Sequence, residues 1–351
     1  MGLETCTEWA RAHRIYGKDH ILPGPRNADW TPYVGAFCES VGGDDTTSVL
    51  ITGHQMGKTD ALVDVFGFQA NEKRRTALMV GLNGFQHLDL RDALEPIIGL
   101  VGDIDDDKPR PHQLATVPEA IAGNWSGPHG PFDINLFDEF DRMDHREGSA
   151  LKLAEAAAYT YKHRPRYAVA TSPHGGGVTK TWKCDNNGLE YWQTGATSSP
   201  GWDLWQRGSM HHWTWPCPSC HGYFVPRFKL LNLDRQNPGL CCPHCQTFIG
   251  DGQKNALNAY GKFVAPGQAI TGFAQNIIGK PSNRTGIESF WVSGLCNPFV
   301  SFDRITRQYW EVYHAARQFK RDSGLRLRVF SNGILGELWE WKPRSRLGRP
   351  L

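Results

Sequence analysis

Residues 48–60 read Ser-Val-Leu-Ile-Thr-Gly-His-Gln-Met-Gly-Lys-Thr-Asp. An apolar, β-branched run leads into a stretch that ends in Gly-Lys-Thr, and apolar residues then recur at helical spacing through Leu62, Val65 and Phe66. This order predicts a strand, a phosphate-binding loop and a helix. The predicted loop and helix start comprise Thr52, Gly53, His54, Gln55, Met56, Gly57, Lys58, Thr59 and Asp60.

Each residue type in this stretch suits the binding of ATP and Mg²⁺. Backbone N–H groups of the loop and of the helix N-terminus bind phosphate oxygens, Lys58 places a positive charge on the β- and γ-phosphates, and the Thr59 hydroxyl ligates Mg²⁺. The usual pattern would put its first glycine at Thr52, whereas here the glycine stands one place later, at Gly53. The alternative is a plain turn between a buried strand and a helix that carries a lysine.

The composition is that of an ordinary globular protein, with 351 residues, 40% hydrophobic residues and 21% charged residues. The formal net charge of +2 gives no global attraction for nucleic acid, so any such contact must rest on local patches. No apolar run is long enough for a membrane span, and the N-terminus has no secretory pattern. We therefore expect a soluble cytoplasmic protein without a membrane partner.

Strand and helix patterns alternate between residues 48 and 173. Further strands are predicted at 76–81, 133–137 and 166–173, and an alanine-rich helix at 150–161. This alternation predicts an α/β fold with a mainly parallel central sheet and helices on both faces. In such folds the active site lies at the carboxyl ends of the strands.

Two acidic residues, Asp138 and Glu139, follow the strand at 133–137. The aspartate is placed to hold the Mg²⁺ shell, and the glutamate to orient and deprotonate the attacking water. Asp141 and Asp144 are rival carboxylates, and a solvated helix start is the alternative interpretation.

Four more residues are candidates for the nucleotide site. Trp30 and Tyr33 precede the loop and suit the stacking of an adenine, or the packing of a sheet edge. Thr171 and Ser172 end the next strand, where a hydroxyl can sense the γ-phosphate or satisfy a turn before a proline.

The doubled Cys-Pro-x-Cys pattern is the most specific local signal. Nine cysteines is an odd number, and four of them form the pairs Cys217, Cys220 and Cys242, Cys245. Four thiolates satisfy tetrahedral Zn²⁺ with no open position, which predicts a structural zinc site in a zinc ribbon. Alternative ligands are Cys241, His211, His212, His221 and His244.

The same pieces suggest a division of the chain. We expect an ATPase core with an N-terminal extension at 1–200, a zinc-ribbon insertion at 201–265, a C-terminal lid or linker part of the ATPase domain at 266–341, and a basic tail at 342–351. A helix is expected from Asp303 to about Arg321.

In this order the motifs resemble the lambda-type (gpA-like) phage terminase large subunit in its N-terminal ATPase domain. The resemblance rests on residues 55–60, 137–142, 171–173, the two cysteine pairs, Ser-Phe-Trp-Val-Ser-Gly-Leu-Cys-Asn-Pro at 289–298 and Phe-Ser-Asn-Gly-Ile-Leu-Gly-Glu at 330–337. It implies a P-loop NTPase fold of the ASCE or RecA-like type. The implied function is an ATP-hydrolysing motor in the host cytoplasm that moves double-stranded DNA into a procapsid.

The resemblance also implies partners and roles. The partners would be the portal protein of the procapsid, a small terminase subunit and further copies of the chain in a ring. Lys58, Thr59, Asp138 and Glu139 would be the nucleotide, Mg²⁺ and water-activating groups, and residues 171–173 would couple hydrolysis to DNA movement.

Two departures from the family matter. The chain ends where a nuclease domain would begin, so it is expected to translocate DNA and not to cut it. His54 stands where many large terminases carry an arginine, so a neighbouring subunit is expected to supply the arginine finger. The candidate donors are Arg74, Arg75, Arg142 and Arg146.

Two other functions share parts of this pattern. A helicase-like ATPase would use the same nucleotide residues, and stimulation by single-stranded rather than duplex DNA would distinguish it. A zinc-ribbon adaptor for DNA or protein with a degenerate phosphate loop would not turn over ATP.

Overall fold

The computed structural model describes residues 5–18, 20–73, 75–82, 90–94, 97, 112–116, 126–127, 130–143, 145, 149–159, 164–271, 276–283, 285–318 and 323–340. Its residues form two compact units. The first comprises Met1–Leu50, Gly57–Thr171 and Gly286–Glu288, and the second comprises Ile51–Met56, Ser172–Thr285 and Ser289–Leu351. The predicted basic tail lies outside the described residues.

A mainly parallel sheet forms the centre of the first unit, as the sequence predicts. Its strands lie in the order β3 (Thr47–Ile51), β9 (Arg166–Thr171), β8 (Ile134–Asp138), β4 (Ala77–Gly81) and β5 (His112–Thr116). The pairs β9–β8, β8–β4 and β4–β5 are parallel. Strands β3, β4 and β8 are buried along their whole length, which explains their near-continuous apolar sequences.

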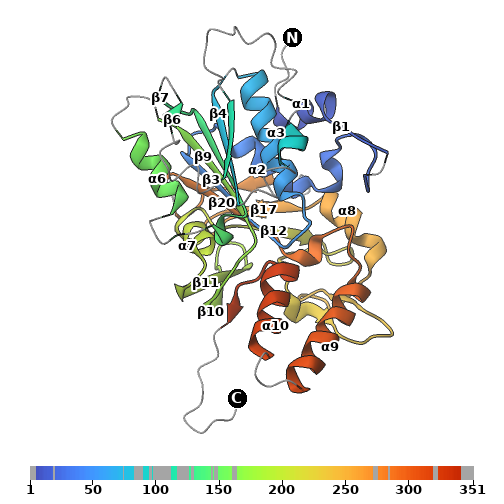
Figure 1. The fold of residues 1–351 in the computed structure, drawn as a ribbon. Coiled ribbons are helices and arrows are strands. Elements are labelled where there is room, and N and C mark those ends of the chain that lie inside the picture. Colours follow the sequence, from blue (N-terminus) through green and yellow to red (C-terminus); the bar gives the residue numbers. More distant parts are fainter. Residues whose placement is uncertain are drawn as a thin grey trace. The chain divides into compact units, whose positions relative to one another are not determined.

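Helix α3 (Lys58–Asn71) packs over β4, β8 and β9 and is covered in turn by α1 (Cys6–His13) and α2 (Pro32–Ser40). In Figure 1 these helices lie to the right of the strands and α6 (Ala150–Ala157) lies to the left. The alanine-rich helix is therefore confirmed, although it ends earlier than predicted. The remaining elements of this unit are β1 (Ile15–Tyr16), β2 (Gly24–Pro25), η1 (Ala28–Trp30), β6 (Ser126–Gly127), β7 (Gly130–Pro131) and η3 (Phe140–Arg142).

Strands of the second unit pair in several groups. In one, β12 (His211–Pro216) pairs in parallel with β20 (Ile287–Trp291) and antiparallel with β13 (Tyr223–Phe224) and β17 (Lys262–Val264). In the next, β10 (Gly176–Lys183) pairs with β11 (Glu190–Thr197) and β21 (Trp339–Glu340). The others are β14 (Leu231–Asn232), β15 (Gly239–Cys241) and β16 (Phe248–Ile249), and the pair β18 (Ala269–Thr271) and β19 (Asn276–Ile278).

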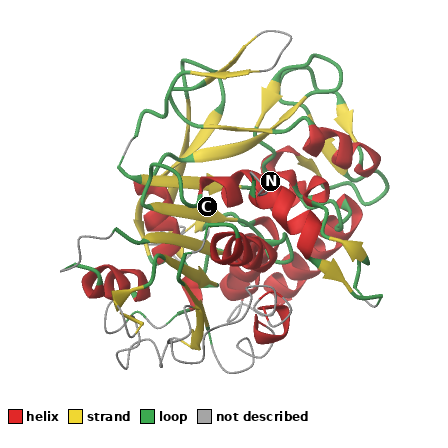
Figure 2. Cartoon of the chain, turned by 90° about the horizontal axis from the view of Figure 1, so that it is seen from above, coloured by secondary structure: helices red, strands yellow, loops and turns green. Residues whose placement is uncertain are grey.

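Helices complete the second unit, and Figure 2 shows the helices of the described chain in red and the strands in yellow. The helices of the second unit are α7 (Pro200–Arg207), η4 (Phe228–Leu230), η5 (Asp251–Gln253), α8 (Lys254–Ala259), η6 (Gly294–Cys296), α9 (Phe302–Gln318), α10 (Ser323–Val329) and the π-helix η7 (Phe330–Leu335). Within the described ranges, no helix combines the length and apolar character that crossing a bilayer requires.

The core of the second unit is rich in aromatic side chains. Trp202, Trp205 and Trp291 are fully buried, and the His212 ring packs against the last two. The pKa of His212 is held well below its usual value, chiefly by burial. The Arg227 guanidinium, 2% exposed, lies 3.9 Å from the ring centre of Trp192. Large flat rings thus provide the buried apolar surface that long periodic helices provide elsewhere.

The packing of α3 leaves no room for a side chain at Gly67. A Cβ atom there would lie 1.9 Å from Cη2 of the fully buried Trp9 on α1. We expect Gly67→Ala to lower the free energy of unfolding by about 1–3 kcal/mol through overpacking, despite the better helix propensity of alanine. Denaturant unfolding measures the change.

The matched control is Gly324→Ala on α10, where no atom lies within 4 Å of the added Cβ. This variant should be neutral or gain up to about 1 kcal/mol from helix propensity. Equal stability of the two variants would show that α1 does not hold α3 as tightly as the structure indicates.

Candidate functional site

The turn after β3 has the geometry that the sequence predicts for a helix start at Lys58. Gly57 adopts φ 86°, a left-handed conformation that favours glycine, and serves as the N-cap of α3. No side chain forms a capping hydrogen bond with the first N–H groups of α3. A helix end of this kind binds anions through its N–H groups and its positive dipole end.

Four predicted site residues come together in the first unit, at the carboxyl end of β8. The Thr59 hydroxyl donates to Oδ2 of Asp138 at 2.8 Å, and Lys58 Nζ lies 3.8 Å from Oε1 of Glu139. Asp138 is fully buried and Lys58 is 5% exposed. One hydroxyl and one cation therefore each contact one of two consecutive carboxylates.

Burial dominates the electrostatics of this group. Burial, reinforced by the negative charge of Glu139, raises the pKa of Asp138 to about 6. Burial also lowers the pKa of Lys58, while the carboxylates of Glu139 and Asp138 oppose that shift. The site thus holds charges at a cost in free energy, which is typical of functional sites.

The backbone at Glu139 is unusual as well. This residue has φ 53°, in the left-handed region that non-glycine residues rarely occupy. The turn brings the carboxylate directly after the strand end and starts η3, in which the main-chain N–H of Asp141 donates to the Thr171 hydroxyl at 3.0 Å. That hydrogen bond joins the ends of β8 and β9.

Asp60 does not share this arrangement. Its Oδ1 accepts from Arg14 Nη2 and from the Tyr16 hydroxyl, both at 2.8 Å. Its pKa is lowered, because the two nearby guanidiniums of Arg14 and Arg26 outweigh the opposing effect of burial. Asp60 thus ties the start of α3 to the N-terminal segment.

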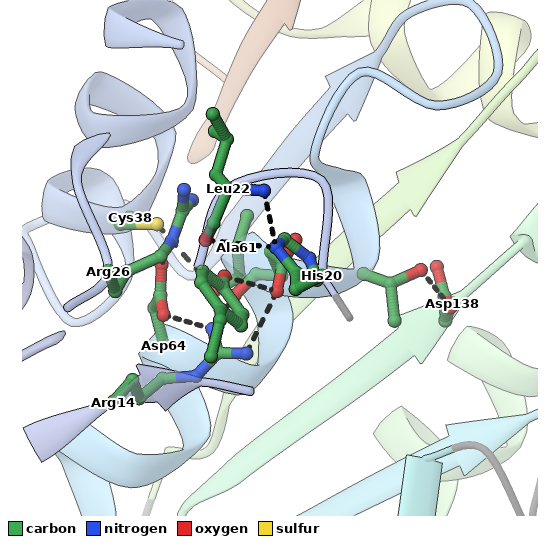
Figure 3. Close-up of polar contacts among 11 residues, drawn as sticks. Arg14, His20, Leu22, Arg26, Cys38, Ala61, Asp64 and Asp138 are labelled. Atoms are coloured by element: carbon green, nitrogen blue, oxygen red, sulfur yellow. Dashed lines mark hydrogen bonds and ion pairs between the residues drawn. The ribbon is translucent and has the colours of Figure 1, made fainter. Parts of the chain in front are cut away.

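Sequence reasoning missed the buried ion cluster behind this contact. Arg14 and Arg26 both bind the carboxylate of Asp64 on α3, and all three side chains are buried (Figure 3). Arg14 also donates to the main-chain carbonyl of Asp60 at 3.0 Å. The two arginines lie far from Asp64 in sequence and in no motif, so no local pattern could have identified them.

The other predicted nucleotide residues differ in their exposure. Tyr33 is fully buried on α2 and its ring offers no exposed face for a base, whereas Trp30 is 39% exposed. Thr171 and Ser172 are 0% and 2% exposed at the end of β9. Of the rival carboxylates, Asp141 is buried in η3, and Asp144 lies outside the described residues.

The first part of the predicted phosphate loop, Thr52–Met56, belongs to the second unit. The Thr52 hydroxyl lies 2.8 Å from Sδ of Met56, and the His54 N–H donates to the carbonyl of Gly333 at 2.6 Å. Gln55 adopts φ 54° and its carbonyl accepts from Nδ2 of Asn297 at 3.1 Å.

The second unit also brings the four predicted zinc ligands together. The Sγ atoms of Cys217, Cys220, Cys242 and Cys245 all lie within 4.8 Å of one another. Two of the Sγ–Sγ distances are 3.6 and 3.9 Å, close to the roughly 3.8 Å edge of a tetrahedron with 2.3 Å zinc–sulfur bonds. The main-chain N–H groups of Ser219 and His244 point at Cys217 and Cys242, each at 3.4 Å. The donor set and its spacing fit Zn²⁺.

The alternative ligands are not part of this cluster in the described chain. Cys241 is the neighbour of a cluster cysteine and is half-buried in β15. The His244 ring is hydrogen-bonded at Nε2 to the carbonyl of Tyr223, and His211 is bonded to the Ser209 hydroxyl. The cysteines alone therefore form the candidate metal centre.

Solved structures similar to this chain include those of phage large terminases. A mutant form of the Thermus phage P74-26 large terminase ATPase domain is 11% identical, with a TM-score of 0.41, and the match covers 90% of this chain and 95% of that one. Another structure of that domain is 10% identical, with a TM-score of 0.39 and coverages of 85% and 89%. The HK97 bacteriophage large terminase is 12% identical, with a TM-score of 0.37 and coverages of 49% and 38%.

A search of curated proteins found no match. A family model does match: the phage terminase large subunit gpA, ATPase domain, over residues 130–263. This span begins just before β8, contains Asp138 and Glu139, and ends beyond the second cysteine pair. The resemblance to the lambda-type terminase large subunit is thereby confirmed, and residues 130–263 are those that match its ATPase domain.

Proposed function

We propose that the chain is an ATPase subunit of a motor that moves double-stranded DNA into a procapsid. The observation that carries the proposal is the grouping of Lys58, Thr59, Asp138 and Glu139 at one sheet edge, with the two acids inside the span that matches the terminase ATPase family. Hydrolysis of ATP in the host cytoplasm would drive the movement.

The four residues divide the work by their chemistry. Lys58 would bind the β- and γ-phosphates, while Thr59 and Asp138 would hold Mg²⁺, which supplies charge neutralisation at the phosphates. Glu139 would accept a proton from the attacking water and orient it. Main-chain N–H groups of the loop and of the helix start would bind phosphate oxygens, apart from that of His54, which is bound to the Gly333 carbonyl.

The remaining roles follow the family resemblance. Residues 171–173 would couple hydrolysis to DNA movement, and DNA would be held through phosphate contacts without base specificity. The portal protein, a small terminase subunit and a homo-oligomeric ring are the proposed partners. The domain boundaries at residues 200, 265 and 341 remain part of this proposal.

An arginine finger from a neighbouring subunit would complete the site, because His54 offers no permanent cation. Arg142 is exposed and close enough to Lys58 to lower its pKa, behind the larger effect of burial, whereas Arg75 is hydrogen-bonded to Gln69. Arg74 and Arg146 lie outside the described residues.

Two substitutions test the nucleotide site. Lys58→Ala should abolish ATP binding, because the lysine contacts ground-state phosphates. Glu139→Gln should leave the dissociation constant unchanged and lower turnover by roughly 10²–10⁴-fold, the usual contribution of a general base. Equilibrium binding and steady-state ATPase assays with duplex DNA measure the two effects separately.

The matched control is Lys152→Ala, which removes an exposed lysine paired with Glu155 on α6. It should bind and hydrolyse ATP like the natural protein. Normal turnover in Glu139→Gln would move the general base to another carboxylate, and normal binding in Lys58→Ala would refute the proposed site.

The raised pKa of Asp138 predicts how the site affects stability. A carboxyl group that titrates near 3.9 in the unfolded chain and at about 6 in the folded protein makes folding take up a proton, so stability falls as pH rises through this window. In metal- and nucleotide-free protein, Asp138→Asn should therefore raise the free energy of unfolding above pH 6, by up to ~3 kcal/mol.

The gain should shrink to about 0.5 kcal/mol at pH 4, where the natural carboxyl group is protonated in the folded protein and about half protonated in the unfolded chain. Asparagine can still accept the Thr59 hydrogen bond through its side-chain oxygen, although the Glu139 N–H, which donates to Oδ1 of Asp138 at 3.1 Å, then loses its acceptor. Urea unfolding at pH 4 and pH 8 measures the difference, and a less stable asparagine variant at pH 8 would mean that the buried charge is compensated.

For the metal centre, elemental analysis should find one zinc per chain. Cys217→Ser should lose the zinc and destabilise the segment around the cluster, because a small module with little core depends on its metal. Cys241→Ser is the matched control, since this neighbour lies outside the cluster, and it should retain the zinc. Metal-free natural protein with the melting profile of zinc-loaded protein would contradict a structural role.

A further inference from the structure

The segment Phe-Ser-Asn-Gly-Ile-Leu-Gly-Glu at 330–337 has no role in the proposed reaction, yet its conformation is unusual. Phe330–Leu335 forms a π-helix, which ends at Gly336 in a left-handed conformation. π-helical segments are rare in proteins, and those that do occur are often found at functional sites. This segment and residues 51–56, which begin the predicted phosphate loop, belong to the same compact unit.

The two segments touch through their backbones. The His54 N–H donates to the Gly333 carbonyl at 2.6 Å. A Cβ atom at Gly53 would lie 2.6 Å from the Ile334 carbonyl oxygen, and one at Gly336 would lie 2.6 Å from the Gly53 nitrogen. Real Cβ atoms do not approach other atoms so closely, so both positions require glycine.

This contact accounts for the position of the loop glycine. The usual pattern has glycine where Thr52 stands, and Thr52 is completely buried, with its hydroxyl against Met56. The close approach to Ile334 falls one residue later, at Gly53, where a side chain cannot fit. The glycine therefore stands at position 53, and not at 52, because the backbone of Ile334 lies against residue 53.

Residues 334–336 are in turn held by contacts with Trp291 and Gly294. Nε1 of Trp291, a fully buried side chain, donates to the Gly336 carbonyl at 2.7 Å. A Cβ atom at Gly294 would lie 1.8 Å from the Ile334 carbonyl oxygen, so η6 backs the same peptide. The Glu337 N–H and the Ser331 carbonyl close the turn with a hydrogen bond of 3.0 Å.

We infer that residues 333–336 are a positioning element for the phosphate loop: they fix the peptides of Gly53 and His54 so that the rest of the loop is preorganised for ATP. The inference rests on the proposed function. Because the His54 N–H is bound to Gly333, that group anchors the loop. Preorganisation of this kind raises affinity by removing the cost of ordering the loop on binding.

Gly336→Ala is the direct test. The added methyl would push against the Gly53 nitrogen and would strain the backbone at φ 66°, so the first half of the loop must shift. We expect the dissociation constant for ATPγS with Mg²⁺ to rise by about tenfold or more, a change that corresponds to ~1.4 kcal/mol. Gly252→Ala, with no atom within 4 Å of its Cβ, should bind like the natural protein.

A second measurement needs no variant and holds even if Gly336→Ala does not fold. In the natural protein, ATPγS with Mg²⁺ should slow amide hydrogen exchange in peptides that cover 330–337 as well as in those that cover 52–59, because each segment orders the other. A segment that merely packs the core would show the same exchange with and without nucleotide.

The outcomes separate the inference from the proposed function. The positioning role would be overturned if Gly336→Ala bound ATPγS as well as the natural protein does. It would also be overturned if ATPγS left the amide exchange rate of residues 330–337 unchanged. Either result would leave the ATPase proposal intact. Natural protein that does not bind ATPγS at all would overturn both. A Gly336→Ala variant that binds ATPγS more weakly than the natural protein, but retains its normal zinc content and is therefore folded around the cysteine cluster, would support the inference.

Discussion

The hydrogen bond between the Thr59 hydroxyl and the Asp138 carboxylate is the contact on which the candidate site depends. It joins the first turn of α3 to the end of β8, and it forms only if the two strands that precede these residues end at the same edge of the sheet. Parallel strands satisfy this requirement, since all their carboxyl ends meet at one edge. In the order β3-β9-β8, strand β9 lies between the other two, and Thr171 at its end accepts from the N–H of Asp141.

Holding these groups at a buried edge has a cost that the surroundings must offset. Asp138 and Lys58 both have pKa values shifted against ionisation, so the edge alone does not favour its own charges. Farther along α3, Asp64 accepts from two buried arginines and fixes the helix against the N-terminal segment. Removing one partner of such a cluster typically costs several kcal/mol, since the remaining charge stays buried. The ion cluster at Asp64 therefore fixes α3 without using the side chains of Lys58 and Thr59.

The strands at 47–51, 77–81, 134–138 and 166–171 could be predicted from the sequence because each has a local signal: a short apolar run bounded by turn residues. The cysteine pairs and Asp138-Glu139 also have local signals, namely the doubled Cys-Pro-x-Cys spacing and the position directly after an apolar strand. Contacts between distant segments have no such signal. The arginines on Asp64 belong to no periodic pattern, and Tyr33, a candidate for base stacking, is buried because α2 packs on α3. Burial of a particular ring is set by tertiary packing, which a single sequence does not encode locally.

The glycine at position 53 illustrates a more general relation between motif and structure. A loop that binds phosphate needs glycine wherever its backbone meets another atom too closely for a Cβ, and that position depends on the neighbour as much as on the ligand. Here the neighbour is Ile334, held by Trp291 through Gly336 and by the close approach of Gly294. A chain with a different segment behind its loop would meet its closest contact at another residue. In this chain, the position of the glycine therefore follows the backbone that lies against residue 53.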